Sequence, residues 1–153
     1  MNDSADSTVG QLLTEEHRII QRVLHVLEQL VKRSQTDNRL DVEALDKCVS
    51  FFRLFADACH HAKEEDLLFP ILEQRGVARE GGPIGVMLDE HRQARGLIGQ
   101  MRQLLDEYRQ GDRLAAVNFR ETASAYVNLM NMHIFKEDNR LFPMGDHLMP
   151  EGD

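Results

Sequence analysis

Basic side chains are scarce in this 153-residue chain, where 18 Lys and Arg stand against 26 Asp and Glu for a formal net charge of −8. Proteins that bind nucleic acid through its phosphates need a basic surface, so this balance argues against a nucleic-acid partner. Apolar runs are short as well, and none approaches the roughly 20 residues that span a bilayer. The polar N-terminal stretch MNDSADSTVG lacks the apolar core of a secretory signal. We therefore expect neither a membrane anchor nor secretion.

Cysteine is nearly absent, since the chain has only Cys48 and Cys59. Two residues are too few for a disulfide framework. On one helix they would lie ~16 Å apart by rise alone, which is too far for a disulfide bond. We expect both to be small buried side chains, and we expect a cytoplasmic protein.

Proline is rare too, with four residues in the chain, and Val and Ile are thinly spread. The common residues are Leu, Ala, Glu, Arg and Gln, which favour helix over strand. Apolar residues recur at helical spacing in four segments, roughly 8–34, 41–74, 83–110 and 112–141. This pattern predicts an all-α protein, an up-down-up-down four-helix bundle. We expect one domain over 1–153, with an ordered core of about 8–145 and loosely held ends.

Turn residues separate the four segments. SQTDN follows the first segment, and REGGP precedes the third, where Pro83 suits the first position of a helix. Gly111 separates the third segment from the fourth. Pro143 and Gly145 are expected to end the fourth.

The chain contains an internal repeat of two helices. LTEEHR at 13–18 resembles MLDEHR at 87–92, which places His17 and His91 74 residues apart. HAKEED at 61–66 resembles HIFKED at 133–138, a separation of 72 residues. Two helix pairs of similar plan therefore follow one another.

The polar residues that interrupt the apolar stripes are His and Glu. A His at position i and a Glu at i+4 project from one helix face, about 6 Å apart along the axis. Counted from the turn of each hairpin, the histidines of paired helices lie within ~3 Å of the same height. The side chains predicted to meet in one layer are His17, His61, Glu65, His91, His133 and Glu137.

A layer of this composition predicts a metal site. Unpaired carboxylates are costly in a protein core, and coordination to a metal removes that cost. Four imidazoles and two carboxylates match two ions, each with two histidines and a share of both carboxylates. Nitrogen and oxygen ligands without sulfur suit iron, manganese or zinc. Glu16 and Glu90 point about 100° away from their neighbouring histidines, and we assign them no role.

A competing register pairs His60 with Glu64, on a face turned about 100° from that of His61. The second half of the repeat has Met132 where His60 would align, so the duplication favours His61 and Glu65. Glu64 remains able to contribute an oxygen. Tyr126 and Met87 lie on the same faces as the predicted ligands, where core packing is the simpler role.

The pattern H…HxxxE…H…HxxxE resembles that of the hemerythrin-like family of HHE cation-binding domains, over nearly the whole chain. The resemblance implies a four-helix bundle holding two non-haem iron ions, with an oxo or carboxylate bridge. Hemerythrin proper has a fifth histidine from an HxxxH pair on its third helix, where Met87 and Arg95 flank His91 here. It also has an aspartate in the last motif, where this chain has Glu137. These differences argue against simple reversible oxygen carriage.

Four hypotheses follow. The first is a di-iron protein that binds or senses O₂, NO or peroxide, with an unknown protein partner or homo-oligomer. The second is a redox enzyme that breaks down peroxide. The third is iron storage or the repair of iron centres. Repair relatives usually carry an additional cysteine-bearing N-terminal domain that this sequence does not show, so we rank repair lower. The fourth is a structural bundle with zinc or no metal.

Overall fold

The computed structural model describes residues 9–148, and the expectation of loosely held ends falls mostly on residues outside this range. The described residues form four helical rods. The first is α1 (Val9–Asp37), and the third is α4 (Pro83–Arg109). The second joins α2 (Val42–Phe51), η2 (Phe52–His61), η3 (Glu64–Leu68) and α3 (Phe69–Gln74). The fourth joins α5 (Leu114–Lys136), η4 (Glu137–Leu141) and α6 (Phe142–Leu148). The prediction of an all-α four-helix bundle is confirmed.

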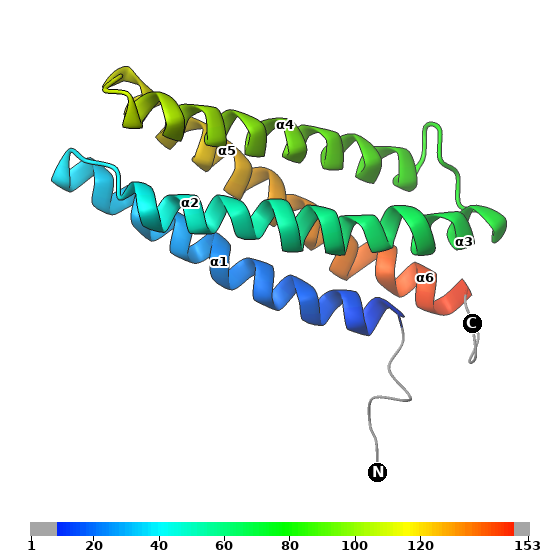
Figure 1. The fold of residues 1–153 in the computed structure, drawn as a ribbon. Helices are drawn as coiled ribbons and strands as arrows, with labels where there is room; N and C mark the ends of the chain where they lie inside the picture. The colour runs from blue at the N-terminus through cyan, green and yellow to red at the C-terminus, as the bar shows by residue number, and fades with distance from the viewer. Residues whose placement is uncertain (1–8, 149–153) are drawn as a thin grey trace, which may run out of the picture.

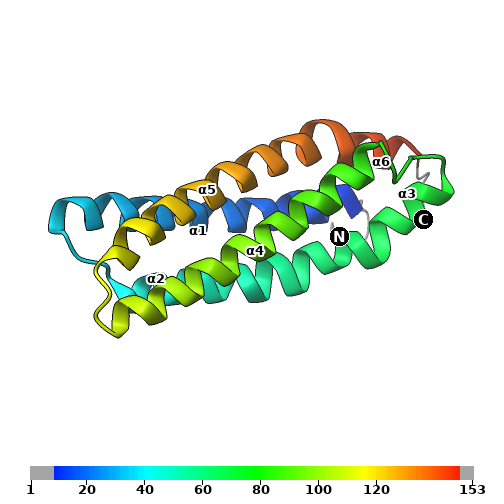
Figure 2. The same cartoon turned by 90° about the horizontal axis from the view of Figure 1, so that it is seen from above.

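The rods alternate in direction, and the α1–α2 and α4–α5 turns lie at the same end of the molecule (Figure 1). Seen from above, the rods run side by side as two hairpins (Figure 2). Individual residues fix where the helices begin and end at these turns. The Asp41 carboxylate accepts a hydrogen bond from the Ala44 N–H and so caps α2. Pro83 begins α4, and Gly111 adopts the left-handed conformation (φ 100°) that the α4–α5 turn requires.

Three segments of the second and fourth rods, η2, η3 and η4, are π-helical. In a π-helix the backbone N–H donates to the carbonyl five residues back, and such turns occur often at functional sites. The Ala62 N–H donates to the Asp57 carbonyl, and the Phe142 N–H donates to the Glu137 carbonyl. A rod can therefore continue through Pro143, which has no N–H to donate. The fourth helix was expected to end there, but it continues to Leu148.

Two apolar clusters fill the bundle. The larger one lies toward the hairpin turns and includes Leu24, Leu45, Phe52, Met101 and Phe119. The smaller one closes the opposite end and consists of Leu13, Leu68, Phe69, Leu72, Ile84, Met87, Leu141 and Phe142. Between them the rods carry the polar layer described below. Within residues 9–148 no helix has both the length and the apolar character that a membrane crossing requires.

Both cysteines are free thiols, as expected. Cys48 is buried in the larger apolar cluster. The expectation of burial is wrong for Cys59, which is partly exposed on η2. Its place beside the polar layer, on the outer side of the rod, explains the difference.

Candidate metal centre

A layer of buried polar side chains crosses the bundle between the two apolar clusters. All four rods contribute to it, and each member is at most 1% exposed. The members are His17 of α1, His60 and His61 of η2, Glu64 of η3, His91 of α4, His133 of α5 and Glu137 of η4. Five imidazoles and two carboxylates thus share a region from which water is excluded.

The two buried carboxylates each connect the two halves of the molecule. The Glu64 Oε1 atom lies 2.7 Å from the Nε2 atom of His60, and its Oε2 atom lies 3.2 Å from that of His91. The Glu137 Oε1 atom lies 2.8 Å from the Nε2 atom of His133 and 3.3 Å from that of His17. Each carboxylate therefore reaches one histidine of its own half and one of the other half. This is the placement expected of bridging ligands.

Further carboxylates hold the outer nitrogen of the histidines. The contacts to Nδ1 are His17 to Asp138 at 2.7 Å, His60 to Glu16 at 3.0 Å, His91 to Glu65 at 2.9 Å and His133 to Glu90 at 3.2 Å. An ionised carboxylate only accepts hydrogen bonds, so Nδ1 carries the proton and donates it. The lone pair of Nε2 then faces the centre of the layer. Histidines that bind metals are held in this way in proteins.

The outer carboxylates are paired with basic side chains nearer the surface. Lys63 binds Glu16, and Lys136 binds Glu90 at 2.9 Å. The hydrogen bond from His60, helped by Lys63, lowers the pKa of Glu16 to about 2. Burial acts to raise the pKa of Glu90, but the hydrogen bonds from His133 and Lys136 outweigh it and lower the pKa. These acids are therefore ionised at neutral pH and remain acceptors.

Arg18 and Arg95 complete this outer arrangement. Arg18 pairs with Asp138, and Arg95 pairs with both Glu65 and Asp57. The guanidinium of Arg95 is thereby turned toward the two carboxylates beside the layer.

The facing imidazole lone pairs and the buried carboxylates of the layer fit a bound cation. The Nε2 atoms of His91 and His133 lie 3.2 Å apart, although both Nδ1 atoms contact carboxylates. Two facing lone pairs at this distance repel one another unless a proton or a metal ion lies between them. Burial raises the pKa of Glu64, and the neighbouring charge of Glu137 raises it further. Both Glu64 oxygens and both Glu137 oxygens lack a hydrogen-bond partner among the described residues. A metal ion satisfies all of these groups together, so the donor set fits one.

The donor atoms gather in two overlapping groups. Within each group the atoms lie within 4.8 Å of one another. The first group is His17, His60, Glu64 and Glu137, and we call it the two-histidine position. The second is His91, His133, Glu64 and Glu137, with His61 close to its two histidines, and we call it the three-histidine position. Glu64 and Glu137 belong to both groups.

His60, His61 and Glu64 lie in the π-helical segments η2 and η3, and all three side chains are buried in the layer. π-Helical turns occur often at functional sites. The ring centroids of His60 and His61 lie 5.8 Å apart.

The structure brings His17, His61, His91, His133 and Glu137 together as the sequence suggested, but it does not bring Glu65. The Glu65 carboxylate lies outside the layer, where it accepts from His91 Nδ1 and pairs with Arg95. Glu64 takes its place inside, and His60 joins it. A signal for this register was present, because LFP recurs at 68–70 and 141–143, 73 residues apart. The same separation aligns His60 with His133 and Glu64 with Glu137.

Glu16 and Glu90, which received no role from the sequence, accept from His60 and His133. Each of these glutamates points away from the histidine beside it in the sequence, and its partner is a histidine of the next rod. Tyr126 is fully buried in the larger apolar cluster, with its ring 4.8 Å from that of Phe52, and its hydroxyl has no hydrogen-bond partner within residues 9–148. Met87 is buried in the smaller apolar cluster.

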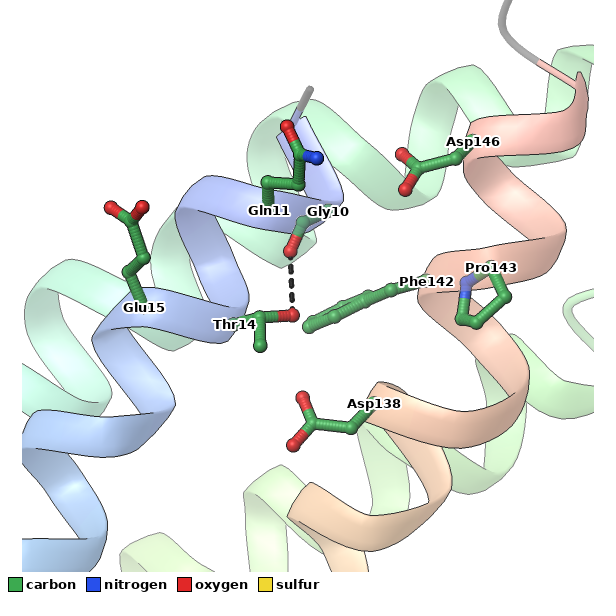
Figure 3. A pocket seen from close by; sticks show the side chains of 8 residues that line it. All are labelled: Gly10, Gln11, Thr14, Glu15, Asp138, Phe142, Pro143 and Asp146. Carbon is green, nitrogen blue, oxygen red and sulfur yellow. Dashed lines mark hydrogen bonds between the residues drawn. The ribbon is translucent and has the colours of Figure 1, made fainter. Parts of the chain in front are cut away.

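An open groove of about 480 Å³ approaches the layer from the outside, between α1 and α6. Its lining includes Thr14, Asp138 and Phe142 (Figure 3). The Phe142 ring stacks on His17 with a centroid distance of 5.2 Å. Phe142 therefore contacts both the groove and a histidine of the two-histidine position.

Comparison with known proteins agrees with this geometry. The family model of the hemerythrin HHE cation-binding domain matches residues 8–145. An iron-sulfur cluster repair protein (YtfE) of Edwardsiella ictaluri is 34% identical over 137 residues, which cover 86% of this chain and 61% of that protein. An uncharacterized protein of Mycobacterium tuberculosis is 26% identical over 136 residues, covering 89% of this chain and 52% of that protein.

The chain thus spans about half to three-fifths of the length of these two curated relatives. No solved structure matches it. The match of the family model covers most of the chain, and the buried histidines and glutamates have the composition of a cation site. The chain belongs to the hemerythrin HHE cation-binding domain family.

Proposed function

We propose that this chain is a hemerythrin-like protein that holds two non-haem iron ions and binds a small ligand such as O₂, NO or peroxide there. The observation that carries the proposal is the pair of shared carboxylates, Glu64 and Glu137, between two groups of inward-facing imidazoles. The iron ligands that we propose are His17, His60, His61, Glu64, His91, His133 and Glu137. Imidazole and carboxylate donors without sulfur suit iron, and the family match supports the assignment.

The protein's own residues hold the donors ready for metal. Burial lowers the pKa of His61 to about 4 and lowers that of His91 further, so both imidazoles are neutral at pH 7. The outer carboxylates fix the Nδ1 proton and the ring orientation of His17, His60, His91 and His133. The apolar clusters on both sides keep bulk water from the layer. When bound, two iron ions would supply reversible redox chemistry and open coordination positions for a small ligand.

Metal analysis together with a visible spectrum tests this proposal. Protein purified from iron-supplied cells should contain close to two irons per chain. The reduced, colourless form should change its spectrum on exposure to O₂ or NO. Two zinc ions per chain, or a spectrum that neither gas changes, would contradict the proposal.

Repair of damaged iron centres is a second candidate, because two curated relatives at 34% and 31% identity are iron-sulfur cluster repair proteins. In that role the chain would release iron to an acceptor protein. Iron-loaded protein would be incubated with an acceptor that lacks its cluster, and recovery of the acceptor's activity would be followed. Recovery no faster than with an equal amount of free ferrous salt would exclude this role.

A further inference from the structure

His61 has no equivalent in the second half of the molecule. The internal repeat aligns residues of the second and fourth rods at a separation of 73, which pairs His60 with His133 and Glu64 with Glu137. At this separation His61 aligns with Ile134, a buried residue of the larger apolar cluster. The rest of the layer is duplicated, whereas His61 occurs once.

The side chains around His61 are also unmatched. Its Nδ1 atom lies 3.5 Å from the Asp57 carboxylate, which Arg95 binds at 2.7 Å. Asp57 aligns with Met130 in the second half. At the separation of 74 that relates His17 to His91, Arg95 aligns with Gln21. The group of Arg95, Asp57 and His61 therefore lies on one side of the layer and has no counterpart on the other side.

The position of His61 puts this group beside one metal position. Its ring stacks on that of His91 at a centroid distance of 3.8 Å and meets the His133 ring edge-on at 5.5 Å. One nitrogen of His61 lies within 4.8 Å of a nitrogen of each of these two histidines. The Asp57 carboxylate lies near Nδ1 of the buried His61, whereas its Nε2 atom has no hydrogen-bond partner among the described residues. A buried imidazole with a free nitrogen, next to two others that face a metal position, is placed to bind the same ion.

We propose that the two metal positions bind their ions with unequal affinity, and that His61 is the cause. This inference rests on the proposed function, since it requires a layer that holds two ions. His61 adds a third imidazole beside His91 and His133, whereas the other position has two imidazoles, and both positions share Glu64 and Glu137. The first ion therefore enters the three-histidine position. The second ion, beside His17 and His60, exchanges with solution more readily.

Arg95 adds to this difference. It binds Glu65 and Asp57 together, and these are the carboxylates beside His91 and His61. One guanidinium therefore fixes the orientation of two histidines of the three-histidine position. Across the layer, Asp138 and Glu16 are bound by separate side chains, Arg18 and Lys63. Outer contacts of this kind affect metal affinity by about 10- to 100-fold.

The test is a titration of the metal-stripped full chain with Co²⁺ as the probe, followed by the visible absorption of the bound ion against a competing chelator. The wild-type protein should bind two ions in two steps whose dissociation constants differ about tenfold or more. His61→Ile introduces the residue that stands at the matching place in the second half. In this variant the stronger step should weaken until the two steps merge, while two ions still bind. His25→Ile, which removes an exposed imidazole of α1, should leave both steps unchanged.

The outcomes separate this inference from the proposed function. Two ions bound to wild-type protein in one unresolved step would overturn the inference and leave the two-metal centre standing. Two steps that His61→Ile leaves unaltered would overturn it as well. Failure of wild-type protein to bind two ions would remove the proposed function itself. Far-UV circular dichroism checks that the variant folds, and His61→Ala provides a second reading should the Ile variant not fold.

Discussion

Glu64 and Glu65 are neighbours in the sequence with opposite environments. The side chain of Glu64 is fully buried between imidazoles, while that of Glu65 is 23% exposed and pairs with Arg95. The difference decides what each carboxylate can do. Within residues 9–148 no Lys or Arg pairs with Glu64, whose oxygens face imidazoles and are placed to bind a metal ion, whereas Glu65 orients a histidine from outside.

This contrast predicts different effects of two similar substitutions. Glu64→Ala removes a shared ligand and should abolish tight binding of at least one ion. Glu65→Ala removes a hydrogen bond to His91 and should weaken binding by about 10- to 100-fold, with two ions still bound at saturating metal. Elemental analysis after gel filtration in excess metal would measure both. A larger loss of metal in the Glu65 variant would contradict the placement of the two side chains.

At the scale of single residues, most members of the polar layer can be predicted from the sequence. His17, His91, His133 and Glu137 follow from helical spacing and from their equal heights above the turns. Glu64 and His60 do not follow, because the duplicated motif pointed to one histidine face, whereas the structure buries both His60 and His61. Both histidines and Glu64 lie in the π-helical segments η2 and η3, which leave no pattern of apolar residues. The repeated LFP was a better guide to the register than the aligned HAKEED and HIFKED.

At the scale of elements, the second rod is unusual because π-helix covers most of its middle, from Phe52 to His61 and from Glu64 to Leu68. α-Helix precedes and follows these segments. Three buried members of the layer, His60, His61 and Glu64, lie in these segments. Without an ion, the segments η2 and η3 hold buried charges and lone pairs close together. The four rods and their turns could be predicted from spacing and turn residues, whereas the helix type within a rod could not.

Hydrogen exchange should therefore distinguish parts of one rod. In metal-free protein, backbone amides of residues 52–68 should exchange faster than those of the α-helical Val42–Phe51, because opening relieves the buried charges. Addition of ferrous iron under anaerobic conditions should slow the exchange of residues 52–68 most. Mass spectrometry of peptic peptides would follow both segments. Equal slowing throughout the rod would argue against a local effect of the metal.

At the scale of the whole molecule, the layer divides the core into two apolar clusters that cannot merge across it. Each rod passes through the layer and contributes ligands. Bound ions would therefore link all four rods, and metal binding and folding should be coupled. The sequence anticipated this arrangement through the equal heights of its histidines.

Removal of metal should consequently lower the melting temperature. An ion that binds only the folded state adds about 2.7 kcal/mol when its free concentration is a hundred times its dissociation constant. For a chain of this length that corresponds to a shift on the order of 5–10 °C per ion. Differential scanning calorimetry with and without EDTA would measure it. Glu64→Ala should show a smaller shift, and an unchanged melting temperature in the wild-type protein would contradict the coupling.

The duplication has one more consequence. Several contacts of the outer network occur in two copies, as with Glu16 and Lys63 on one side and Glu90 and Lys136 on the other. The duplicated contacts can therefore serve as matched controls for one another in mutagenesis. A substitution in one copy can be compared with its twin in the same fold, at the same depth and in the same solution. Any difference between the twins then measures the asymmetry of the centre directly.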